Sequence, residues 1–439
     1  MRVLLISTYE LGRQPFGLAS PAAWLRAEGH EVTVVDLACN PLPRPAVEQA
    51  EAIAFYLPMH TATRLFLRVL DRVKSFNPEA RLCAYGLYAP LNAALLRRNG
   101  VGTVVGGEFE QGLVDWARGD GPDRASVSLA RQRFLVPDRA GMPPLAAYAQ
   151  LVTNGATQRV GYTEASRGCK HLCRHCPVVP VYRGQFRIVQ PEVVLADIRQ
   201  QVAAGAGHIT FGDPDFLNGP RHAVQIVEAL HAEWPELTYD ATIKIEHLLK
   251  HQDLLRVLKQ TGCVLVISAV ESLDDSVLRK LEKGHTRADF EKALSLMRDA
   301  GLEMSPTFIP FTPWTTREGY REFLQALMQL DLAGDVAPIQ LAIRLLIPEG
   351  SLMLEMAEVR AMIEPYDHRA LCYPWHNRDR SMDQLCIAIQ ETIKREERKR
   401  SSRLEIFRAI GELAQAGSFP DVPMAARATI PYLTEPWYC

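Results

Sequence analysis

Residues 166–177 read SRGCKHLCRHCP and place three cysteines, Cys169, Cys173 and Cys176, within eight positions. Thiols this close together in a chain without an export signal are typical of a metal site. A structural zinc site normally has four protein ligands, so a neighbouring histidine or a distant residue would have to complete it. A four-iron cluster also takes four thiolates when it is fully ligated. With three, one metal position stays open for an outside ligand, which is typical of a catalytic site.

The cysteine stretch begins where the first strand of a predicted β-α series ends. From residue 159 onward, apolar runs typical of buried strands alternate with helical patterns. The predicted strands cover residues 159–166, 208–213, 238–245, 264–272, 303–311 and 339–347. Such a series predicts a partial (β/α)6 barrel of parallel strands. Active groups of parallel barrels lie at the carboxyl ends of the strands, which is where the cysteines fall.

A second α/β unit precedes this barrel. Its predicted strands cover residues 2–7, 31–37, 52–58, 81–86 and 103–107, with helical patterns between them. The alternation predicts a doubly wound, Rossmann-like parallel sheet. Ligands of such sheets bind beyond the carboxyl ends of the strands.

These patterns divide the chain into four parts. Residues 1–125 form the predicted Rossmann-like domain, and the turn-rich residues 126–158 form a predicted linker. Residues 159–350 form the partial barrel. Residues 351–439 are expected to be mainly helical, with one long helical segment over 384–417.

Composition narrows the class of protein. The 439 residues carry a net charge of −2, so no bulk electrostatic field would recruit nucleic acid. No apolar run approaches the roughly 20 residues that a membrane-spanning helix needs, and the opening MRVLLIS is too short for a signal peptide. We therefore expect a cytoplasmic protein without a membrane or nucleic-acid partner. The six other cysteines are scattered, and most are expected to be buried apolar side chains.

The C-x3-C-x2-C spacing at the end of the first barrel strand resembles the radical S-adenosylmethionine (radical SAM) superfamily, and the resemblance spans residues 159–350. It implies that Cys169, Cys173 and Cys176 bind a [4Fe-4S] cluster whose open iron takes the amino and carboxylate groups of S-adenosylmethionine. It also implies that an electron from the reduced cluster cleaves the sulfonium to a 5′-deoxyadenosyl radical. We expect an external reductant such as flavodoxin or ferredoxin to supply that electron.

A second match to this family is FGDPDF, residues 211–216, at the end of the second strand. It implies that Gly212 permits close backbone approach to the cofactor and that Asp213 accepts from its methionyl ammonium. A helix N-cap or an Asx-turn is the alternative for Asp213.

A third match is SAVESLDDSVLRKLEKGHT, residues 268–286. It implies that Glu271 and Ser272 contact the ribose or the methionyl group, and that Lys283 meets a carboxylate. For Lys283, an exposed cation at a helix end is equally open. Arg344 lies in an apolar strand and is expected to point into the barrel, toward the cofactor or an internal carboxylate. A purely structural ion pair is the alternative.

The N-terminal unit resembles the cobalamin-binding domain that precedes the barrel in one branch of the family. The D-x-H-x-x-G motif, whose histidine ligates cobalt, is absent, because residues 7–20 read STYELGRQPFGLAS. Cobalamin binding without a protein ligand and complete loss of cobalamin both stay open.

The tail LTEPWYC, residues 433–439, resembles radical SAM proteins named for a CUAEP or CCAEP tail. One hypothesis is that a selenocysteine codon was read as the stop after Cys439. In-frame codons for AEP downstream would support it.

Together these features predict a radical SAM enzyme that cleaves S-adenosylmethionine to start radical chemistry on a small-molecule or peptide substrate, followed by methyl transfer where cobalamin is bound. No side chain of the protein itself is assigned as the catalytic residue. Two alternatives stay open. One is a cobalamin-independent radical SAM enzyme with a vestigial N-terminal domain. The other is a non-catalytic iron–sulfur or zinc-binding protein.

Overall fold

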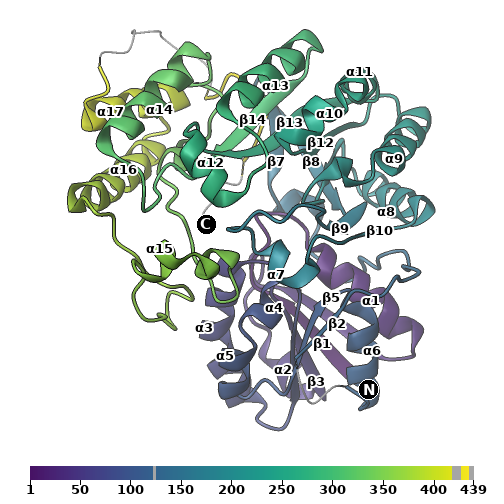
Figure 1. Ribbon diagram of the computed structural model, residues 1–439. Coiled ribbons are helices and arrows are strands. Elements are labelled where there is room, and N and C mark those ends of the chain that lie inside the picture. Colours follow the sequence, from purple (N-terminus) through teal and green to yellow (C-terminus); the bar gives the residue numbers. More distant parts are fainter. Residues whose placement is uncertain (122–124, 418–426, 435–439) are drawn as a thin grey trace.

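The computed structural model describes residues 1–121, 125–417 and 427–434. Its N-terminal part is a parallel sheet with the strand order β2-β1-β3-β4-β5-β6 (Figure 1). The strands are β1 (Arg2–Ser7), β2 (Glu31–Asp36), β3 (Ala52–Tyr56), β4 (Arg81–Tyr85), β5 (Thr103–Gly107) and β6 (Ser126–Ser128). All five predicted strands are present. The sixth, β6, comes from the segment that we predicted as a linker.

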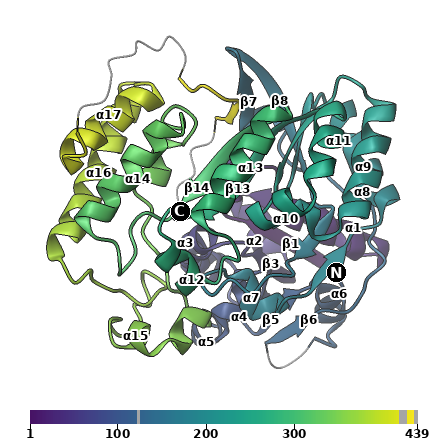
Figure 2. The same cartoon turned by 45° about the horizontal axis from the view of Figure 1, so that its top comes forward.

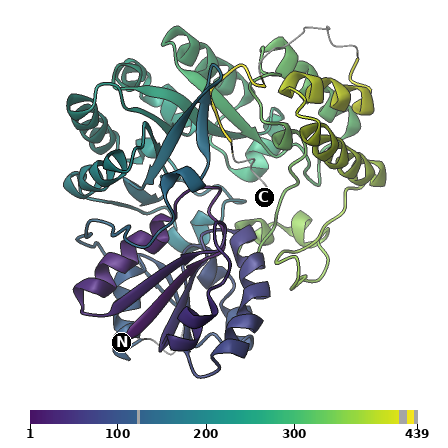
Figure 3. The ribbon, with the colours of Figure 1, turned by 180° about the vertical axis from the view of Figure 1, so that it is seen from behind.

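Helices cover both faces of this sheet, as seen from behind in Figure 3. Successive side chains of β1 point to opposite faces of the sheet. Leu4 and Ile6 pack with α3 on one face, and Val3 and Leu5 pack with α1 and α6 on the other. The helices are α1 (Phe16–Ala27), α2 (Arg44–Gln49), α3 (His60–Phe76), α4 (Tyr88–Leu91), α5 (Ala93–Arg98) and α6 (Glu110–Arg118). The doubly wound arrangement predicted from the sequence is confirmed.

The second sheet is a curled half-barrel with the order β14-β13-β12-β11-β8-β7-β15 (Figure 2). Its parallel strands are β8 (Ala156–Thr163), β11 (His208–Phe211), β12 (Thr238–Thr242), β13 (Cys263–Glu271) and β14 (Glu303–Phe308). The antiparallel strands β7 (Gln150–Thr153) and β15 (Tyr432–Leu433) extend it. The predicted partial barrel of parallel strands is therefore confirmed as a fold class.

Helices pack on the outer face of the half-barrel and share one large core with its strands. They are α8 (Pro191–Ala203), α9 (Pro220–Glu233), α10 (Ile245–Lys250), α11 (Leu255–Gln260), α13 (Arg287–Asp299) and α14 (Arg317–Gln329). Helix α12 (Asp275–Leu281) packs instead in a smaller core with Leu345 and Trp375. Shorter elements near the cysteines are β9 (Ser166–Gly168), α7 (Val178–Tyr182) and β10 (Phe186–Ile188), and short 3-10 turns cover Leu145–Ala147, Phe216–Asn218, Gln252–Leu254 and Leu352–Glu355.

The segment predicted as a sixth barrel strand, residues 339–347, differs from the prediction. It begins as a 3-10 turn (Pro338–Leu341) and then forms a single parallel bridge between Phe311 and Arg344. The Gln340 side-chain oxygen accepts the backbone N–H of Phe308 at 3.0 Å, so a side chain occupies part of the edge that a full strand would pair with.

The C-terminal region is mainly helical, with α15 (Ala357–Arg360), α16 (Arg380–Arg398) and α17 (Arg403–Ala414). The long segment predicted over 384–417 is two helices. The break falls before Ser402, which caps the N-terminus of α17. Its hydroxyl accepts the N–H of Glu405, and the Glu405 carboxylate accepts the N–H of Ser402, which together form a capping box. Among the described helices, none is both long and apolar enough to cross a membrane. Cys439 and the rest of the tail after Thr434 lie outside the described residues.

Candidate active site

The cysteine loop, residues 169–177, leaves β9 and enters α7. Gly168 immediately before it has a φ of +76°, and a Cβ at that position would lie 2.4 Å from Tyr182 Cδ1. Only glycine fits there. The Asn218 side chain accepts the N–H of Lys170 at 3.2 Å and donates to the carbonyl of Gly168 at 3.4 Å. The start of the loop is therefore fixed by backbone geometry and by one amide side chain.

The three loop cysteines line one cavity, which we call the cysteine cavity. The ends of β11, β12 and β13 complete it. Its lining residues are Cys169, His171, Cys173, His175, Cys176, Val179, Pro214, Asp215, Thr242, Lys244, Ala269, Glu271 and Lys283. The loop thus lies at the carboxyl ends of the barrel strands, where parallel barrels carry their active groups.

None of the three thiols forms a disulfide, and no fourth cysteine lines the cavity within the described ranges. Burial raises the pKa of Cys169 and raises that of Cys176 to about 12. Without a metal these thiols are therefore protonated, and a metal that binds them must displace protons. Three unpaired thiols in one cavity fit a cluster held by three thiolates.

Glu271 ties the loop to the barrel. Its Oε1 lies 3.1 Å from His175 Nε2 and 3.2 Å from Lys283 Nζ. Burial favours the neutral acid, but the Lys283 ammonium and His175 outweigh it and lower the pKa of Glu271 to about 2. Glu271 also has a φ of +68°, an uncommon conformation that tends to occur at functional sites.

Lys283 is only 3% exposed and lines the cavity, so it is a buried paired cation and not an exposed one at a helix end. Ser272 instead borders a neighbouring cavity with Trp314 and Thr315, and its hydroxyl accepts the N–H of Asp274. The structure therefore brings together Glu271 and Lys283 of the predicted set, with Ser272 beside them.

Gly212 and Asp213 lie outside the cysteine cavity. Asp213 is buried, and its two oxygens accept from the N–H of Ala165 at 2.9 Å and from the Ser166 hydroxyl at 2.5 Å. Burial raises the pKa of this carboxyl to about 7. A Cβ on Gly212 would lie 2.1 Å from the Tyr162 hydroxyl. These contacts favour a role for both residues in joining β11 to the chain that leads into β9.

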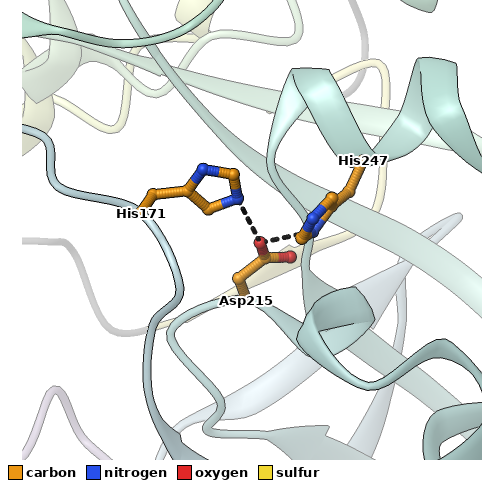
Figure 4. Close-up of side chains that lie close together, drawn as sticks. All are labelled: His171, Asp215 and His247. Atoms are coloured by element: carbon orange, nitrogen blue, oxygen red, sulfur yellow. Dashed lines mark ion pairs between the residues drawn. The ribbon is translucent and has the colours of Figure 1, made fainter. Parts of the chain in front are cut away.

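Asp215, two residues later, does line the cavity, and the sequence reasoning missed it. Its Oδ2 lies 2.7 Å from His247 Nδ1 and 3.8 Å from His171 Nε2 (Figure 4). All three atoms are buried and have no hydrogen-bond partner of acceptable geometry among the described residues. Burial, followed by Lys244, lowers the pKa of His171 to about 4, so this imidazole is neutral. Together, Asp215, His171 and His247 can hold one cation or accept an ammonium group.

Arg344 lies away from the cavity. Its Nη1 pairs with Asp383 of α16 at 2.6 Å, its Nη2 donates to the carbonyl of Trp375, and its guanidinium stacks on the Trp375 ring at 3.6 Å. These contacts favour the structural ion pair over a cofactor contact. They also attach the α16 region to the open side of the barrel.

Residues 163–327 match the family described as the radical SAM superfamily. This match confirms the predicted radical SAM domain in this part of the chain. Such a domain implies a [4Fe-4S] cluster and S-adenosylmethionine as cofactors.

Two proteins of known identity are similar to parts of this chain. A hopanoid C-3 methylase from Methylococcus capsulatus is 24% identical over 352 residues, which is 74% of this chain and 66% of that protein. A tRNA-2-methylthio-N(6)-dimethylallyladenosine synthase from Desulfosudis oleivorans is 29% identical over 177 residues, 38% of this chain and 37% of that protein. The chain thus spans just under two thirds of the first relative and little over a third of the second.

Two solved structures share the fold across both domains. The cobalamin-dependent radical SAM enzyme OxsB with aqua-cobalamin superposes with a TM-score of 0.70 at 15% identity, covering 89% of this chain and 66% of OxsB. The radical SAM methyltransferase TsrM from Kitasatospora setae, with cobalamin and a [4Fe-4S] cluster bound, gives 0.62 at 17% identity, covering 83% and 79%. At this identity the likeness shows the fold.

We predict that Cys169→Ala, Cys173→Ala and Cys176→Ala each lose most of the bound iron and sulfide, because each removes one of three thiols. Iron, sulfide and zinc are measured after purification without oxygen. Cys372→Ala, a partly exposed cysteine outside the cavity, is the control and should keep its iron. Zinc without sulfide in the parent protein would contradict an iron–sulfur site.

Proposed function

We propose that this protein binds a [4Fe-4S] cluster through Cys169, Cys173 and Cys176 and cleaves S-adenosylmethionine reductively to start radical chemistry. The observation that carries the proposal is the set of three unpaired thiols in one cavity at the carboxyl ends of the barrel strands. The bound cluster supplies one electron to the sulfonium and an open iron for the methionyl group. The substrate is proposed to be a small molecule or a peptide, and the electron donor an external protein such as flavodoxin or ferredoxin.

The side chains of the protein position and shield this cofactor pair. Asp215 offers a buried carboxylate oxygen with unused hydrogen-bonding capacity, which suits the cofactor's ammonium better than Asp213 does, since both oxygens of Asp213 are taken. Glu271 holds His175 and Lys283, and so fixes the loop between Cys173 and Cys176 against the barrel. Because Glu271 pairs with His175 and Lys283 inside the cavity, the loop is held against the barrel. A loop held in this position can exclude water from the cavity.

The experiment that tests the proposal is anaerobic incubation of the cluster-reconstituted protein with S-adenosylmethionine and dithionite. We expect 5′-deoxyadenosine, measured by mass spectrometry, in the parent protein and its loss in Cys173→Ala. An intact cluster that neither binds S-adenosylmethionine nor yields deoxyadenosine would contradict the proposal and favour a non-catalytic iron–sulfur protein.

Asp215→Asn and Asp213→Asn form a matched pair that separates cofactor contact from structural support. We expect Asp215→Asn to weaken S-adenosylmethionine binding by about tenfold or more, because it loses a charge-assisted hydrogen bond, with little change in Tm. Asp213→Asn should instead lower Tm, because an amide cannot accept both hydrogen bonds. Equilibrium dialysis and thermal melting measure the two effects, and the reverse pattern would return the cofactor contact to Asp213.

Methyl transfer with cobalamin is a second candidate, favoured by the shared fold of the N-terminal domain. A cavity between the two domains, the seam cavity, lies at the carboxyl ends of the N-terminal strands. It is lined by Glu10, Tyr56, Pro58, Leu87, Gly107, Phe109, Tyr162, Glu164, Ser166, Arg167, Gly168, Val178, Tyr182, Gly212 and Pro214. No histidine is among these described residues, so the donor set does not fit a histidine-ligated cobalt.

We expect any hydroxocobalamin that the protein retains on gel filtration to show no histidine nitrogen in its spectrum, because none lines the seam cavity. Leu87→Trp, which fills the N-terminal side of this cavity, should reduce the retained amount. S-adenosylhomocysteine that forms only with added cobalamin would support methyl transfer. If the parent protein retains no cobalamin, the cobalamin-independent alternative is favoured.

A further inference from the structure

We propose that the exposed surface of the cysteine loop is the docking site for the electron donor, a small one-electron carrier with an acidic surface. This inference rests on the proposed function, because only a redox cluster needs such a donor. We call the region the loop surface and define it by Lys170, Leu172, Arg183, Lys250 and His251. In Figure 1 the elements that flank the loop, β9, α7 and β10, lie between the two domains, and α10, which ends at Lys250, lies on the barrel.

The loop surface has an apolar centre directly beside a predicted cluster ligand. Leu172 is 51% exposed and immediately precedes Cys173. It packs beside the turn between α7 and β10, because a Cβ on Gly184 would lie 3.2 Å from Leu172 Cδ2 and 3.5 Å from the carbonyl of Lys170. An exposed leucine on a loop that carries redox ligands is well placed to contact a transient partner.

Basic side chains surround this leucine. Lys170, Arg183 and Lys250 are exposed, and no described residue forms an ion pair with any of them. His251 follows Lys250 directly, and ring contacts connect it to the loop: its ring centre lies 5.7 Å from that of His247, which lies 4.9 Å from that of His171. Lys170 also lies 5.0 Å from the centre of the Phe186 ring on β10.

Nearby carboxylates do not cancel this charge. Glu246 pairs with Lys244 at 3.2 Å, and Glu282 pairs with Arg174 at 2.5 Å. Asp253 raises the pKa of His251 and so offsets one positive charge. The surface keeps a local positive excess on a chain whose net charge is −2. An acidic carrier would be attracted here and not to the protein as a whole.

These features suit a brief redox encounter. Electron-transfer complexes are small, below about 1,200 Å² of buried surface, and depend on charge to raise the association rate. In the docked complex one electron leaves the reduced carrier and enters the cluster site, so the carrier is oxidised and no bond forms or breaks. The route is short, because Leu172 is adjacent in sequence to Cys173.

The test compares two reductants on one reaction. Arg183→Glu/Lys250→Glu reverses charge on the loop surface without touching the residues between the cysteines. Arg68→Glu/Arg72→Glu makes the same charge change on the exposed side of α3 and is the matched control. Deoxyadenosine formation is measured against the concentration of reduced flavodoxin, and separately with dithionite. A third variant, Leu172→Ser, tests the apolar centre.

We expect the loop-surface double variant to raise the KM for flavodoxin by about tenfold and to weaken its dependence on salt, while the dithionite-driven rate stays unchanged. Leu172→Ser should raise the same KM, and the control should not. A loop-surface variant whose KM for flavodoxin stays at the parent value would overturn the proposal. An equal rise in KM in the loop-surface and control variants would also overturn it. Binding of oxidised flavodoxin, measured by calorimetry, gives the same comparison without turnover. If dithionite yields no deoxyadenosine in the parent protein, the proposed function fails and the binding data still decide the docking site.

Discussion

The buried guanidinium of Arg167 connects the two domains and the cysteine loop. It pairs with Glu108 and Glu110, which follow β5, and with Glu164, which follows β8. Its guanidinium carbon lies 4.6–5.5 Å from the ring centres of Phe16, Phe109 and Phe134. Burial raises the pKa of Glu108 to about 7 and also raises that of Glu164, so burial opposes the ionisation of these carboxyls while Arg167 favours it. Removing one partner of a buried ion pair typically costs about 3–5 kcal/mol, a large part of a domain's stability of roughly 5–15 kcal/mol.

Arg167 stands two residues before Cys169, so the domain contact and the loop share one short strand. After Arg167 the chain turns at Gly168, meets the Asn218 amide and then presents the first thiol. The far side of the loop is held to the barrel by Glu271 through His175. One end of the loop is thus positioned by both domains. The other end is held to the barrel by Glu271 and continues into α7, which packs on Leu87 and Leu91 of the N-terminal domain. The close positioning of three thiols follows from this pair of anchors.

Much of this could be predicted from the sequence, for reasons that also explain the failures. Buried parallel strands are continuous apolar runs, so the five N-terminal strands and five barrel strands were recognisable. The sixth was not formed, because the polar Gln340 side chain binds the strand edge, and an apolar pattern does not reveal that contact.

The cysteines were recognised by spacing alone. Asp213 and Asp215 lie two residues apart just beyond β11, and which of them faces the cavity depends on how the chain turns there. Arg344 was correctly judged too costly to bury unpaired, but its partner, Asp383, lies on a helix 39 residues away.

The seam cavity and the cysteine cavity adjoin the same chain segment, and Pro214 lines both. Ser166, Arg167 and Gly168 line the first, and Cys169 begins the second. Asp213 holds Ser166, and the Arg167 cluster holds the next residue, so a molecule in the seam would contact a strand that is already fixed by buried hydrogen bonds. A ligand there must either fit against this strand as it stands or break contacts with Arg167. Because the thiols follow within a few residues, the second course would also move the loop. The two sites are therefore coupled by covalent continuity over β9, whatever occupies the seam.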